Sequence, residues 1–324
     1  MATPTNEGTA VLLVSHGTVD DLADLPGFLR NIRRGHAPSP ELVAEVRKRY
    51  EAIGGKSPLN DVSRALAEGL EKRLEIPVRM ANRLWKPYAS DVLASLARNG
   101  VTRVIVLPLA QHSAHVYGTA VETAALELTS HGDQKLHVKA APNWGKEPLL
   151  VQAYADAIRT GLRAIDQAHH GRTTVVLTAH SLPKAVIAAG DPYEREVRES
   201  AELVAKAVGE AMPRWVVAFQ SQGLAPKGTG EASGAPVPEW LGPGLEATFD
   251  DLRARGDTHV LVAPVGFLAD HVEILYDIDI EAKAWAADRG LALTRTASLN
   301  TSPLLLDTLE KLARGLLADG ASRS

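Results

Sequence analysis

An internal repeat is the feature that most limits how this chain can fold. Residues 100–108, Gly-Val-Thr-Arg-Val-Ile-Val-Leu-Pro, closely match residues 256–264, Gly-Asp-Thr-His-Val-Leu-Val-Ala-Pro, and each proline is followed seven residues later by a histidine. Earlier in each half, an apolar run ends in a small residue and a histidine, at His16 and at His180. A chain that repeats such a pattern is expected to form two similar units.

Short apolar runs bounded by turn residues alternate with stretches of helical period, which is typical of βα units with a parallel sheet. We therefore predict an α/β protein made of two similar Rossmann-like domains, each a four-stranded parallel sheet flanked by helices. The predicted strands are residues 10–14, 78–83, 101–107, 137–141, 173–178, 214–220, 258–263 and 292–296. The predicted helices are residues 40–53, 62–74, 90–98, 116–128, 148–169, 194–208, 244–255, 271–287 and 302–317.

The repeat also predicts where the chain divides. The N-terminal α/β domain is expected over residues 9–168 and the C-terminal one over residues 169–320. Within the second, residues 225–238 are rich in Gly, Pro and Ser and cannot bury enough apolar surface to order themselves, so this segment is predicted to be a mobile surface loop.

Histidines follow buried strands at corresponding places in both halves: His16, His112 or His115, His180 and His271. Open α/β sheets bind ligands beyond the carboxyl ends of their strands. One histidine near a strand end is more often a packing residue. Four in corresponding places favour a single crevice lined by imidazoles.

Composition narrows the class of partner. The formal net charge is -4, from 35 basic and 39 acidic residues, so nothing indicates nucleic acid or an anionic membrane and a small-molecule partner is expected. The chain has no cysteine, which excludes disulfides, thiolate zinc sites and cysteine-held iron–sulfur clusters. The N-terminus lacks the pattern of a signal peptide, and no apolar run reaches the ~18 residues of a membrane span. We therefore expect a cytoplasmic protein without an integral membrane segment.

A row of carboxylates follows the last of these histidines. Glu273, Asp277 and Glu281 recur every four residues, which on a helix stacks them on one face, with Val272, Leu275, Tyr276 and Ile280 expected on the packed side. A solvated acidic stripe is the ordinary explanation. Here, however, the row begins at a strand end, and closely spaced carboxylates bind protons or cations more readily. Oxygen ligands suit magnesium or transiently bound ferrous iron.

Two further features point to chemistry at the same end of the strands. His180 follows an apolar strand and precedes a proline, so rigid backbone fixes it as a ligand or base must be. A basic segment that includes Arg33 and Arg34 is suited to hold a polycarboxylate ligand at the rim of an apolar cleft, because guanidinium groups match carboxylates.

Together these segments resemble the ferrochelatases over nearly the whole chain, in motif order, and most closely the coproporphyrin III ferrochelatases of Gram-positive bacteria. The segments that carry the resemblance are Ile32–Gly35, Arg49–Leu59, Ala179–Pro183, Gly190–Tyr193, Phe219–Gly223, Glu239–Pro243 and Pro264–Asp277. The resemblance implies the two-domain chelatase fold and a lyase that inserts ferrous iron into a porphyrin in haem biosynthesis.

The resemblance also implies roles for individual residues. His180 and Glu273 match the catalytic, metal-binding pair, and Asp277 and Glu281 match further metal-binding carboxylates. Arg49 matches an arginine that joins these last two at an outer, magnesium-type site. Residues expected near the porphyrin are Arg33, Tyr50, Ser57, Lys86, His112 and His16, and His16 stands where the relatives have a tyrosine and is expected to bind metal.

Several questions stay open at this point. The porphyrin is expected to be coproporphyrin III, with protoporphyrin IX the other candidate, and the residue that takes the first pyrrole proton is not defined. Porphyrin and ferrous iron are the expected partners of a monomer with no tightly bound cofactor. Alternatives are a cobalt or nickel chelatase of a sirohydrochlorin-type tetrapyrrole, and a non-catalytic porphyrin- or haem-binding protein.

Overall fold

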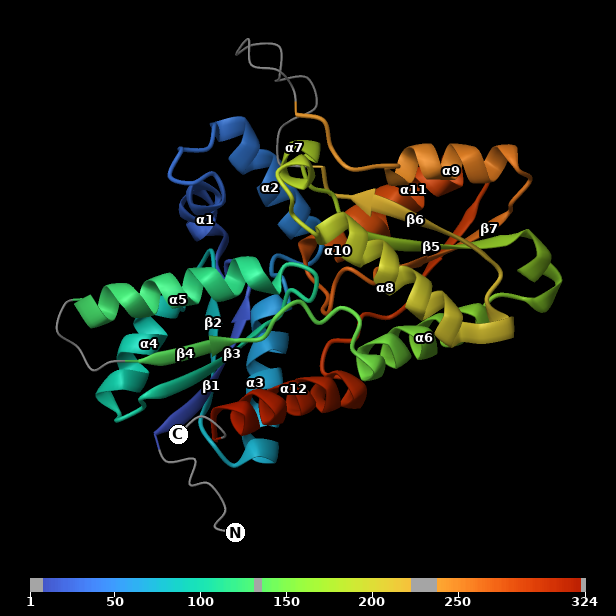
Figure 1. Cartoon of the computed structure of the whole chain (residues 1–324). Helices are drawn as coiled ribbons and strands as arrows, with labels where there is room; N and C mark the ends of the chain where they lie inside the picture. Colours follow the sequence, from blue (N-terminus) through green and yellow to red (C-terminus); the bar gives the residue numbers. More distant parts are fainter. Residues whose placement is uncertain (1–7, 131–135, 223–237, 322–324) are drawn as a thin grey trace. The chain divides into compact units, whose positions relative to one another are not determined.

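A computed structural model of the chain describes residues 8–130, 136–222 and 238–321, and these form two compact units, each built on one sheet (Figure 1). Unit 1 comprises Met1–Ala37, Ser57–Leu149 and Asn300–Ser324. Unit 2 comprises Pro38–Lys56 and Leu150–Leu299.

The sheet of unit 1 contains four parallel strands in the order β2-β1-β3-β4. They are β1 (Thr9–Ser15), β2 (Val78–Asn82), β3 (Arg103–Pro108) and β4 (His137–Ala140). Every residue of β1 is buried, because helices cover both faces of the sheet, and its sequence is accordingly apolar without alternation.

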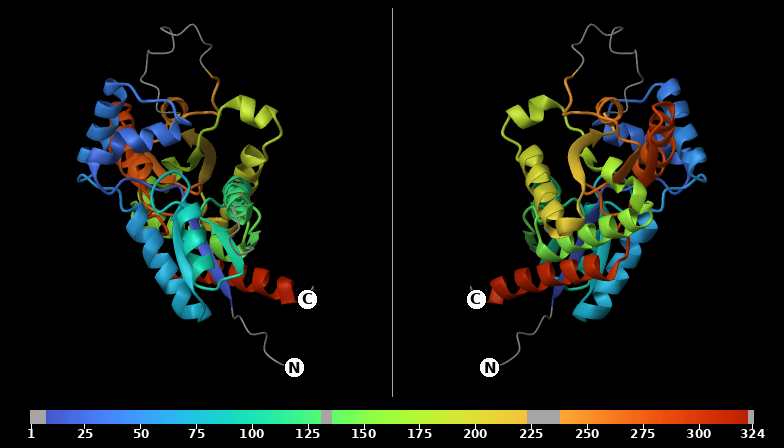
Figure 2. Two further views of the ribbon diagram at one scale, coloured as in Figure 1. Left: turned by 90° about the vertical axis from the view of Figure 1, so that its left-hand side faces the viewer. Right: turned by 90° about the vertical axis from the view of Figure 1, so that its right-hand side faces the viewer.

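Helices α4 (Ala89–Arg98) and α5 (Ala114–Ser130) pack on one face of this sheet, over Leu12, Val14 and Val106. Helices α3 (Leu59–Leu74) and α12 (Pro303–Ala321) pack against each other and the strands, and the views in Figures 1 and 2 place α3 and α5 on opposite sides of the sheet. The 3₁₀ turn η1 (Leu22–Asp24) and helix α1 (Leu25–Ile32) follow β1.

The sheet of unit 2 has the order β6-β5-β7-β8, again all parallel. Its strands are β5 (Thr173–His180), β6 (Arg214–Gln220), β7 (His259–Ala263) and β8 (Ala292–Arg295). This order repeats that of unit 1 strand for strand, which confirms the duplicated fold predicted from the repeat.

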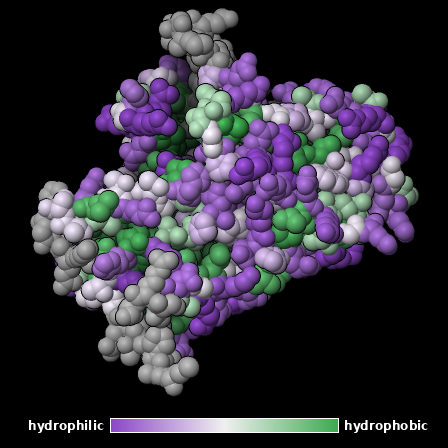
Figure 3. Space-filling model, in the orientation of Figure 1, coloured by the Kyte–Doolittle hydropathy of each residue, from purple (hydrophilic) through white to green (hydrophobic). Residues whose placement is uncertain are grey.

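Helices also cover both faces of the second sheet. Helices α9 (Leu245–Ala254), α10 (Val272–Leu275) and α11 (Lys283–Asp288), with a π-helical segment at Asp277–Ala282, pack on the face that carries Val176 and Val262. Helix α8 (Tyr193–Val208) packs on the other face, against Ala179 and Phe219. The surface over α8 is largely hydrophilic in Figure 3.

The remaining helices of unit 2 are α2 (Pro40–Ala52), α6 (Pro148–Arg163) and α7 (Lys184–Ala188), and its 3₁₀ turns are η2 (Gln167–Arg172) and η3 (Gly209–Ala211). Among the described residues, no helix is both long and apolar enough to cross a membrane. The predicted mobile loop at residues 225–238 lies, except for its last residue, outside the described part of the chain.

The two units do not follow a single cut in the sequence. Helix α12 belongs to unit 1, where Asp307 pairs with Arg73 at 2.6 Å and Arg103 donates to the Leu316 carbonyl oxygen at 2.8 Å. Helix α2 belongs to unit 2, where Arg49 pairs with Asp277. The units therefore differ from the predicted domains 9–168 and 169–320, because α2 and α6 lie in unit 2 and α12 lies in unit 1.

The eight strands lie within two residues of their predicted bounds at each end. Two predicted helices were wrong, and two observed helices were not predicted. The helix predicted at 148–169 ends at Arg163, because the His170 ring lies 3.1 Å from the Leu162 carbonyl oxygen and 3.0 Å from that of Ile165 and occupies the end of the helix. The helix predicted at 271–287 is broken into three segments, and α1 and α7 were not predicted.

Candidate active site at the strand ends

His180 is the last residue of β5, which lies between β6 and β7. Its Nδ1 is in hydrogen-bond contact with the Ser181 carbonyl oxygen, and its own carbonyl oxygen accepts a hydrogen bond from the Tyr193 hydroxyl at 2.9 Å. A carbonyl oxygen can only accept, so Nδ1 carries a proton. In neutral His180 the other nitrogen, Nε2, can therefore accept a proton or bind a metal. It lies 3.6 Å from Glu273 Oε1.

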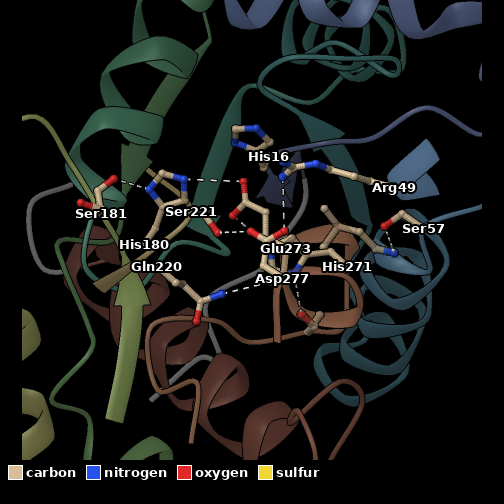
Figure 4. A network of polar contacts seen from close by, with 12 residues as sticks. His16, Arg49, Ser57, His180, Ser181, Gln220, Ser221, His271, Glu273 and Asp277 are labelled. Carbon is tan, nitrogen blue, oxygen red and sulfur yellow. Dashed lines mark hydrogen bonds and ion pairs between the residues drawn. The ribbon is translucent and has the colours of Figure 1, made fainter. Parts of the chain in front are cut away.

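Glu273 lies in the first turn of α10, and its carboxylate contacts two histidines. Its second oxygen, Oε2, lies 3.6 Å from Nε2 of His271, whose Nδ1 is 3.0 Å from the Ala269 carbonyl oxygen. The side chain of Gln220 donates to the Glu273 carbonyl oxygen at 3.0 Å and so holds the backbone in place. Two imidazoles thus approach the two oxygens of one carboxylate from strand ends β5 and β7 (Figure 4).

These contacts change the protonation of the pair. Burial disfavours the charged form of each side chain, but the charge of Glu273 and its hydrogen bond outweigh burial at His180 and raise the pKa of the imidazole. For Glu273, burial is likewise outweighed by His180 and His271, and the pKa of the carboxyl is held well below its ordinary value. Both side chains remain about one-third exposed, at 32% and 31%, so the pair can still exchange protons with a bound ligand.

Asp277 is the second carboxylate of the row and is more deeply buried, with 10% of its side chain exposed. Its Oδ2 accepts a hydrogen bond from the Ser221 hydroxyl at 2.5 Å, and its Oδ1 lies 3.5 Å from Nη1 of Arg49. Burial raises the pKa of Asp277 to about 7, and the charge of Glu273 adds to the shift while Ser221 and Arg49 oppose it. Asp277 can therefore gain and lose a proton near neutral pH.

Arg49 connects the row to helix α2. Its guanidinium lies 5.3 Å from the centroid of the Tyr276 ring. Burial disfavours its charge, but the nearby carboxylates, Asp277 first and then Glu281, outweigh that cost and raise the pKa of the guanidinium. The third member of the row, Glu281, therefore lies near enough for its charge to act on Arg49.

The sequence led us to expect that a regular α-helix carries the carboxylate row. The structure instead has a π-helical segment at Asp277–Ala282. The amide of Glu281 donates to the carbonyl oxygen of Tyr276, five residues back, at 3.0 Å. Four residues of an α-helix turn by about 400°, so a row at every fourth residue drifts by roughly 40° per step. A π turn holds more residues, so four of them turn by less. The π segment at Asp277–Ala282 therefore offsets the drift of α10 and keeps the row aligned.

The π turn also changes which side chains of this segment are buried. Ile274, Ile278 and Ala282 are fully buried, at 0% exposure, beside the carboxylate row. Ile280, which the sequence placed on the packed side, is 40% exposed. A periodic pattern of i and i+4 positions does not distinguish an α turn from a π turn, and this accounts for the wrong assignment.

The other predicted site residues divide by exposure. His16, Arg33 and Lys86 of unit 1 are exposed. Ser57 of unit 1 is fully buried, and its hydroxyl accepts a hydrogen bond from the Leu59 amide at 3.4 Å at the start of α3. Tyr50 of unit 2 is 1% exposed. Buried side chains of this kind present no surface to a ligand in this conformation.

His112 is also buried, at 2% exposure, and lies directly against Gly145, where an added Cβ would come within 2.3 Å of its ring. Burial, with the charge of Lys146, lowers the pKa of His112 to about 4, so the ring is neutral. His112 therefore behaves as the packing histidine that is the ordinary interpretation of a single strand-end histidine.

Two residues of the site, Gln220 and Ser221, were not assigned a role from the sequence. Gln220 is the last residue of β6, and Ser221 directly follows it. The rule that ligands bind beyond strand ends could have found both, since they lie at the end of an apolar strand that had been predicted correctly. Ser221 has a left-handed φ of 59°, which turns its hydroxyl toward Asp277, and no sequence pattern signals that conformation.

The chemical capacity of the cluster is acid–base and metal exchange. It offers two imidazole nitrogens with free lone pairs when neutral, one carboxylate held ionised and one that titrates near neutral pH. No group of three or more His, Asp or Glu side chains within the described residues is arranged as a metal site. Metal binding by His180 and Glu273, with Asp277 and Glu281, therefore stays a prediction.

The sequence of this chain is similar to known proteins over most of its length. A family model described as Ferrochelatase matches residues 8–316. A ferrochelatase of Acidobacterium capsulatum is 36% identical over 322 residues, which cover 95% of this chain and 94% of that protein. Coproporphyrin III ferrochelatases of Nocardia farcinica and Listeria innocua are 34% and 32% identical, covering 91% and 92% of this chain and 84% and 95% of theirs.

Solved structures share the fold at lower identity. SirB from Bacillus subtilis with Fe³⁺ matches with a TM-score of 0.58 at 14% identity, covering 97% of this chain and 98% of that one. A sirohydrochlorin chelatase SirB from Bacillus subtilis subspecies spizizenii in complex with cobalt matches with a TM-score of 0.56 at 11% identity, covering 97% of each chain. These likenesses establish the chelatase fold that was predicted.

Proposed function

Because this chain belongs to the ferrochelatase family, we propose that it is a lyase that inserts ferrous iron into a porphyrin in haem biosynthesis. The observation that carries the proposal is the His180–Glu273–His271 cluster at the strand ends of unit 2, in which two imidazole nitrogens approach one ionised carboxylate.

The proposed reaction requires a group that removes protons from the porphyrin, and the His180–Glu273–His271 cluster can supply it. Ferrous iron replaces two pyrrole N–H protons, so two protons must leave for each iron that enters. With Nδ1 of His180 donating to a carbonyl oxygen, Nε2 is the atom that binds iron or takes a pyrrole proton. The imidazolium that results is stabilised by Glu273, which raises the pKa of His180. His180 and Glu273 are accordingly the catalytic pair of the proposal.

Protons then need a route away from the macrocycle. Asp277, whose pKa is about 7, is suited to accept a proton from the pair and pass it on. Glu281 follows along the same segment, and its charge helps to keep Arg49 of helix α2 protonated. We therefore assign Asp277 and Glu281 to the proton route.

We favour coproporphyrin III over protoporphyrin IX as substrate. Two relatives that cover most of this chain are named coproporphyrin III ferrochelatases. Coproporphyrin III carries more carboxylates, which suits the exposed cations Arg33 and Lys86. His16 is proposed as a further porphyrin and metal contact. Tyr50, Ser57 and His112 stay in the proposal as predicted contacts, although each is buried in this conformation.

We further propose that the protein is a monomer in the cytoplasm, with porphyrin and ferrous iron as its partners and no tightly bound cofactor. The outer magnesium site does not fit the residues as they lie. Arg49 already places a positive charge 3.5 Å from Asp277, where a cation would bind. No step of the proposed reaction uses magnesium.

An anaerobic assay of ferrous iron insertion tests the proposal. Coproporphyrin III and protoporphyrin IX are compared at equal concentrations, with sirohydrochlorin and Co²⁺ or Ni²⁺ in parallel, since SirB shares the fold and His16 is exposed at a strand end. Faster metallation of coproporphyrin III supports the proposal. Metallation of sirohydrochlorin alone, or tight porphyrin binding without any metallation, contradicts it in favour of the second chelatase or a carrier.

A further inference from the structure

We infer that Tyr117 positions His16 so that His16 Nε2 binds the iron of the metalloporphyrin product. The inference rests on the proposed function, because it concerns the product of that reaction. It assigns a role to a tyrosine that neither the repeat nor the family motifs singled out, and it concerns unit 1 alone.

His16 lies at a rigid place and is accessible. It directly follows β1, whose residues are all buried, and its side chain is exposed. Its Nδ1 lies 3.2 Å from the Tyr117 hydroxyl. The Phe28 ring meets the imidazole edge-on, at 87° and 6.5 Å between centroids. The ring is thus held by a polar contact at Nδ1 and an apolar contact with Phe28.

Tyr117 is itself held firmly. It is 8% exposed and belongs to the core between α5 and the sheet. The next residue, Gly118, lets α5 approach β4 so closely that an added Cβ would lie 2.7 Å from the Ala140 Cβ. The Arg83 guanidinium lies 5.3 Å from the centroid of the Tyr117 ring, a favourable cation–π contact. The hydroxyl is therefore a fixed partner for His16.

A fixed hydrogen-bond partner at one ring nitrogen of a histidine favours metal binding by the other ring nitrogen. Metal-ligating histidines almost always donate their second N–H to a neighbouring oxygen, which sets the tautomer and raises the basicity of the ligating nitrogen. In the tautomer that we propose, Nδ1–H donates to the Tyr117 hydroxyl oxygen and Nε2 of His16 keeps its lone pair. That lone pair can fill an axial position of iron in the product, displacing a water, with no change of oxidation state.

This role distinguishes the product from the substrate. A metal-free porphyrin has no axial position, so the contact forms after iron has entered the macrocycle. His16 and Tyr117 should therefore strengthen the binding of an iron porphyrin and leave that of the metal-free porphyrin nearly unchanged. A purely structural role for Tyr117 would weaken both to the same extent.

Equilibrium titrations with ferric coproporphyrin III and with metal-free coproporphyrin III test the inference. The Tyr117→Phe variant, which keeps the buried ring, should bind the ferric porphyrin about 10-fold more weakly, the lower end of the range for loss of such a partner. Its affinity for the metal-free porphyrin should stay within about twofold of wild type by the same reasoning. His16→Ala should lose the absorption bands of a nitrogen-ligated haem, and Tyr117→Phe should add no further loss in that background.

Tyr88→Phe is the matched control. Its hydroxyl accepts a hydrogen bond from Asn31 at 2.9 Å in the same unit, so this variant removes a comparable hydroxyl away from His16. It should leave both affinities unchanged. Equal losses for both porphyrins in Tyr117→Phe, or no loss for either, would overturn the inference.

Two parallel measurements separate this inference from the proposed function. Iron insertion by the wild-type protein tests the function by itself. Nitrogen NMR of His16 in the ligand-free protein tests the positioning by itself, with His16→Ala identifying the signal. One tautomer with Nδ1 protonated in the wild type, and a mixture in Tyr117→Phe, is expected. The same tautomer populations in both proteins would overturn the inference even if iron insertion proceeds.

Discussion

The two sheets share one strand order, but the histidines at their strand ends have different neighbours. In unit 2, His180 and His271 both approach Glu273. In unit 1, His16 contacts the Tyr117 hydroxyl and His112 is buried and neutral. A duplicated fold thus repeats the position of a side chain without repeating its chemistry. The neighbours decide whether a strand-end histidine acts as a base, a ligand or a packing residue.

These different neighbours suit the histidines of the two units to different roles. A carboxylate stabilises an imidazolium, so unit 2 is suited to take protons. The hydroxyl and the aromatic ring that contact His16 carry no charge, so they do not stabilise an imidazolium as Glu273 does, and in our proposal unit 1 holds a ligand. The predictions below test the two units against each other.

The largest expected difference is in catalysis. Glu273→Gln removes the charge that stabilises protonated His180 and should lower the rate of iron insertion by about 100-fold or more, the usual range for loss of acid–base catalysis. His16→Ala in unit 1 should lower the insertion rate by less than ~10-fold, because it removes no part of that acid–base pair. Single-turnover insertion under anaerobic conditions gives both rates.

Glu239→Gln serves as the matched carboxylate control, because Glu239 is 79% exposed and pairs with Lys184 on the surface. It should insert iron at the wild-type rate. If Glu273→Gln kept more than a tenth of wild-type activity, the assignment of unit 2 as the catalytic unit would be wrong.

A second comparison concerns the glycines that let the chain pass close to each strand end. An added Cβ at Gly266 would lie 2.5 Å from the Ala179 Cβ, one residue before His180. At Gly17, which follows His16 and has a φ of +89°, it would lie 2.7 Å from the Asn82 Cβ. Each substitution by alanine should lower the free energy of unfolding by about 1–3 kcal/mol in denaturant titrations.

Gly171→Ala is the control, since a Cβ added at Gly171 would have no neighbouring atom within 4 Å. It should change the free energy of unfolding by less than ~0.5 kcal/mol. A cost at Gly171 equal to that at Gly266 would show that loss of glycine alone, and not the close approach, is responsible.

The strands could be predicted because their signals are local. An apolar run bounded by turn residues predicts a strand such as β6 at its observed bounds, and the strand then places whatever follows it. The burial of Asp277, the π turn beneath it and the exchange of α2 and α12 between the units depend on contacts between segments far apart in the sequence. Neither periodicity nor composition carries that information.

The ionisation of Asp277 should make the free energy of unfolding depend on pH, and this effect is smaller than the preceding ones. Its pKa rises from 3.8 in the unfolded chain to about 7 in the folded protein, so its ionisation lowers stability as pH rises from about 4 to about 8. Asp277→Asn removes that loss. The free energy of unfolding should match that of wild type near pH 4 and exceed it by about 1 kcal/mol or more at pH 8.

Asp91, an exposed residue in the first turn of α4, provides the comparison in unit 1. Asp91→Asn removes a surface carboxylate and should change the free energy of unfolding by less than ~0.5 kcal/mol. A stability difference between Asp277→Asn and wild type that did not grow with pH would contradict the raised pKa.

The smallest effect is the coupling between His180 and Glu273. The raised pKa of His180 stabilises the folded protein below pH 6.5, the ordinary pKa of histidine, and this stabilisation is lost as the pH rises through the pKa of the folded state. The lowered pKa of Glu273 stabilises the folded protein above pH 4.5, the ordinary pKa of glutamate. Both contributions are present between these values. Because the pair is about one-third exposed, a double-mutant cycle with glutamine at each position should give only ~0.5–1 kcal/mol at pH 5.5 and less at pH 8.5.

The most direct test of the central claim combines porphyrin binding and iron insertion on the same samples of wild type and His180→Ala. Porphyrin fluorescence gives binding, and anaerobic addition of ferrous iron gives insertion. We predict that His180→Ala binds the porphyrin with nearly wild-type affinity but inserts iron at least ~100-fold more slowly, because the base at the end of β5 is gone. Insertion at a wild-type rate by His180→Ala would contradict the account.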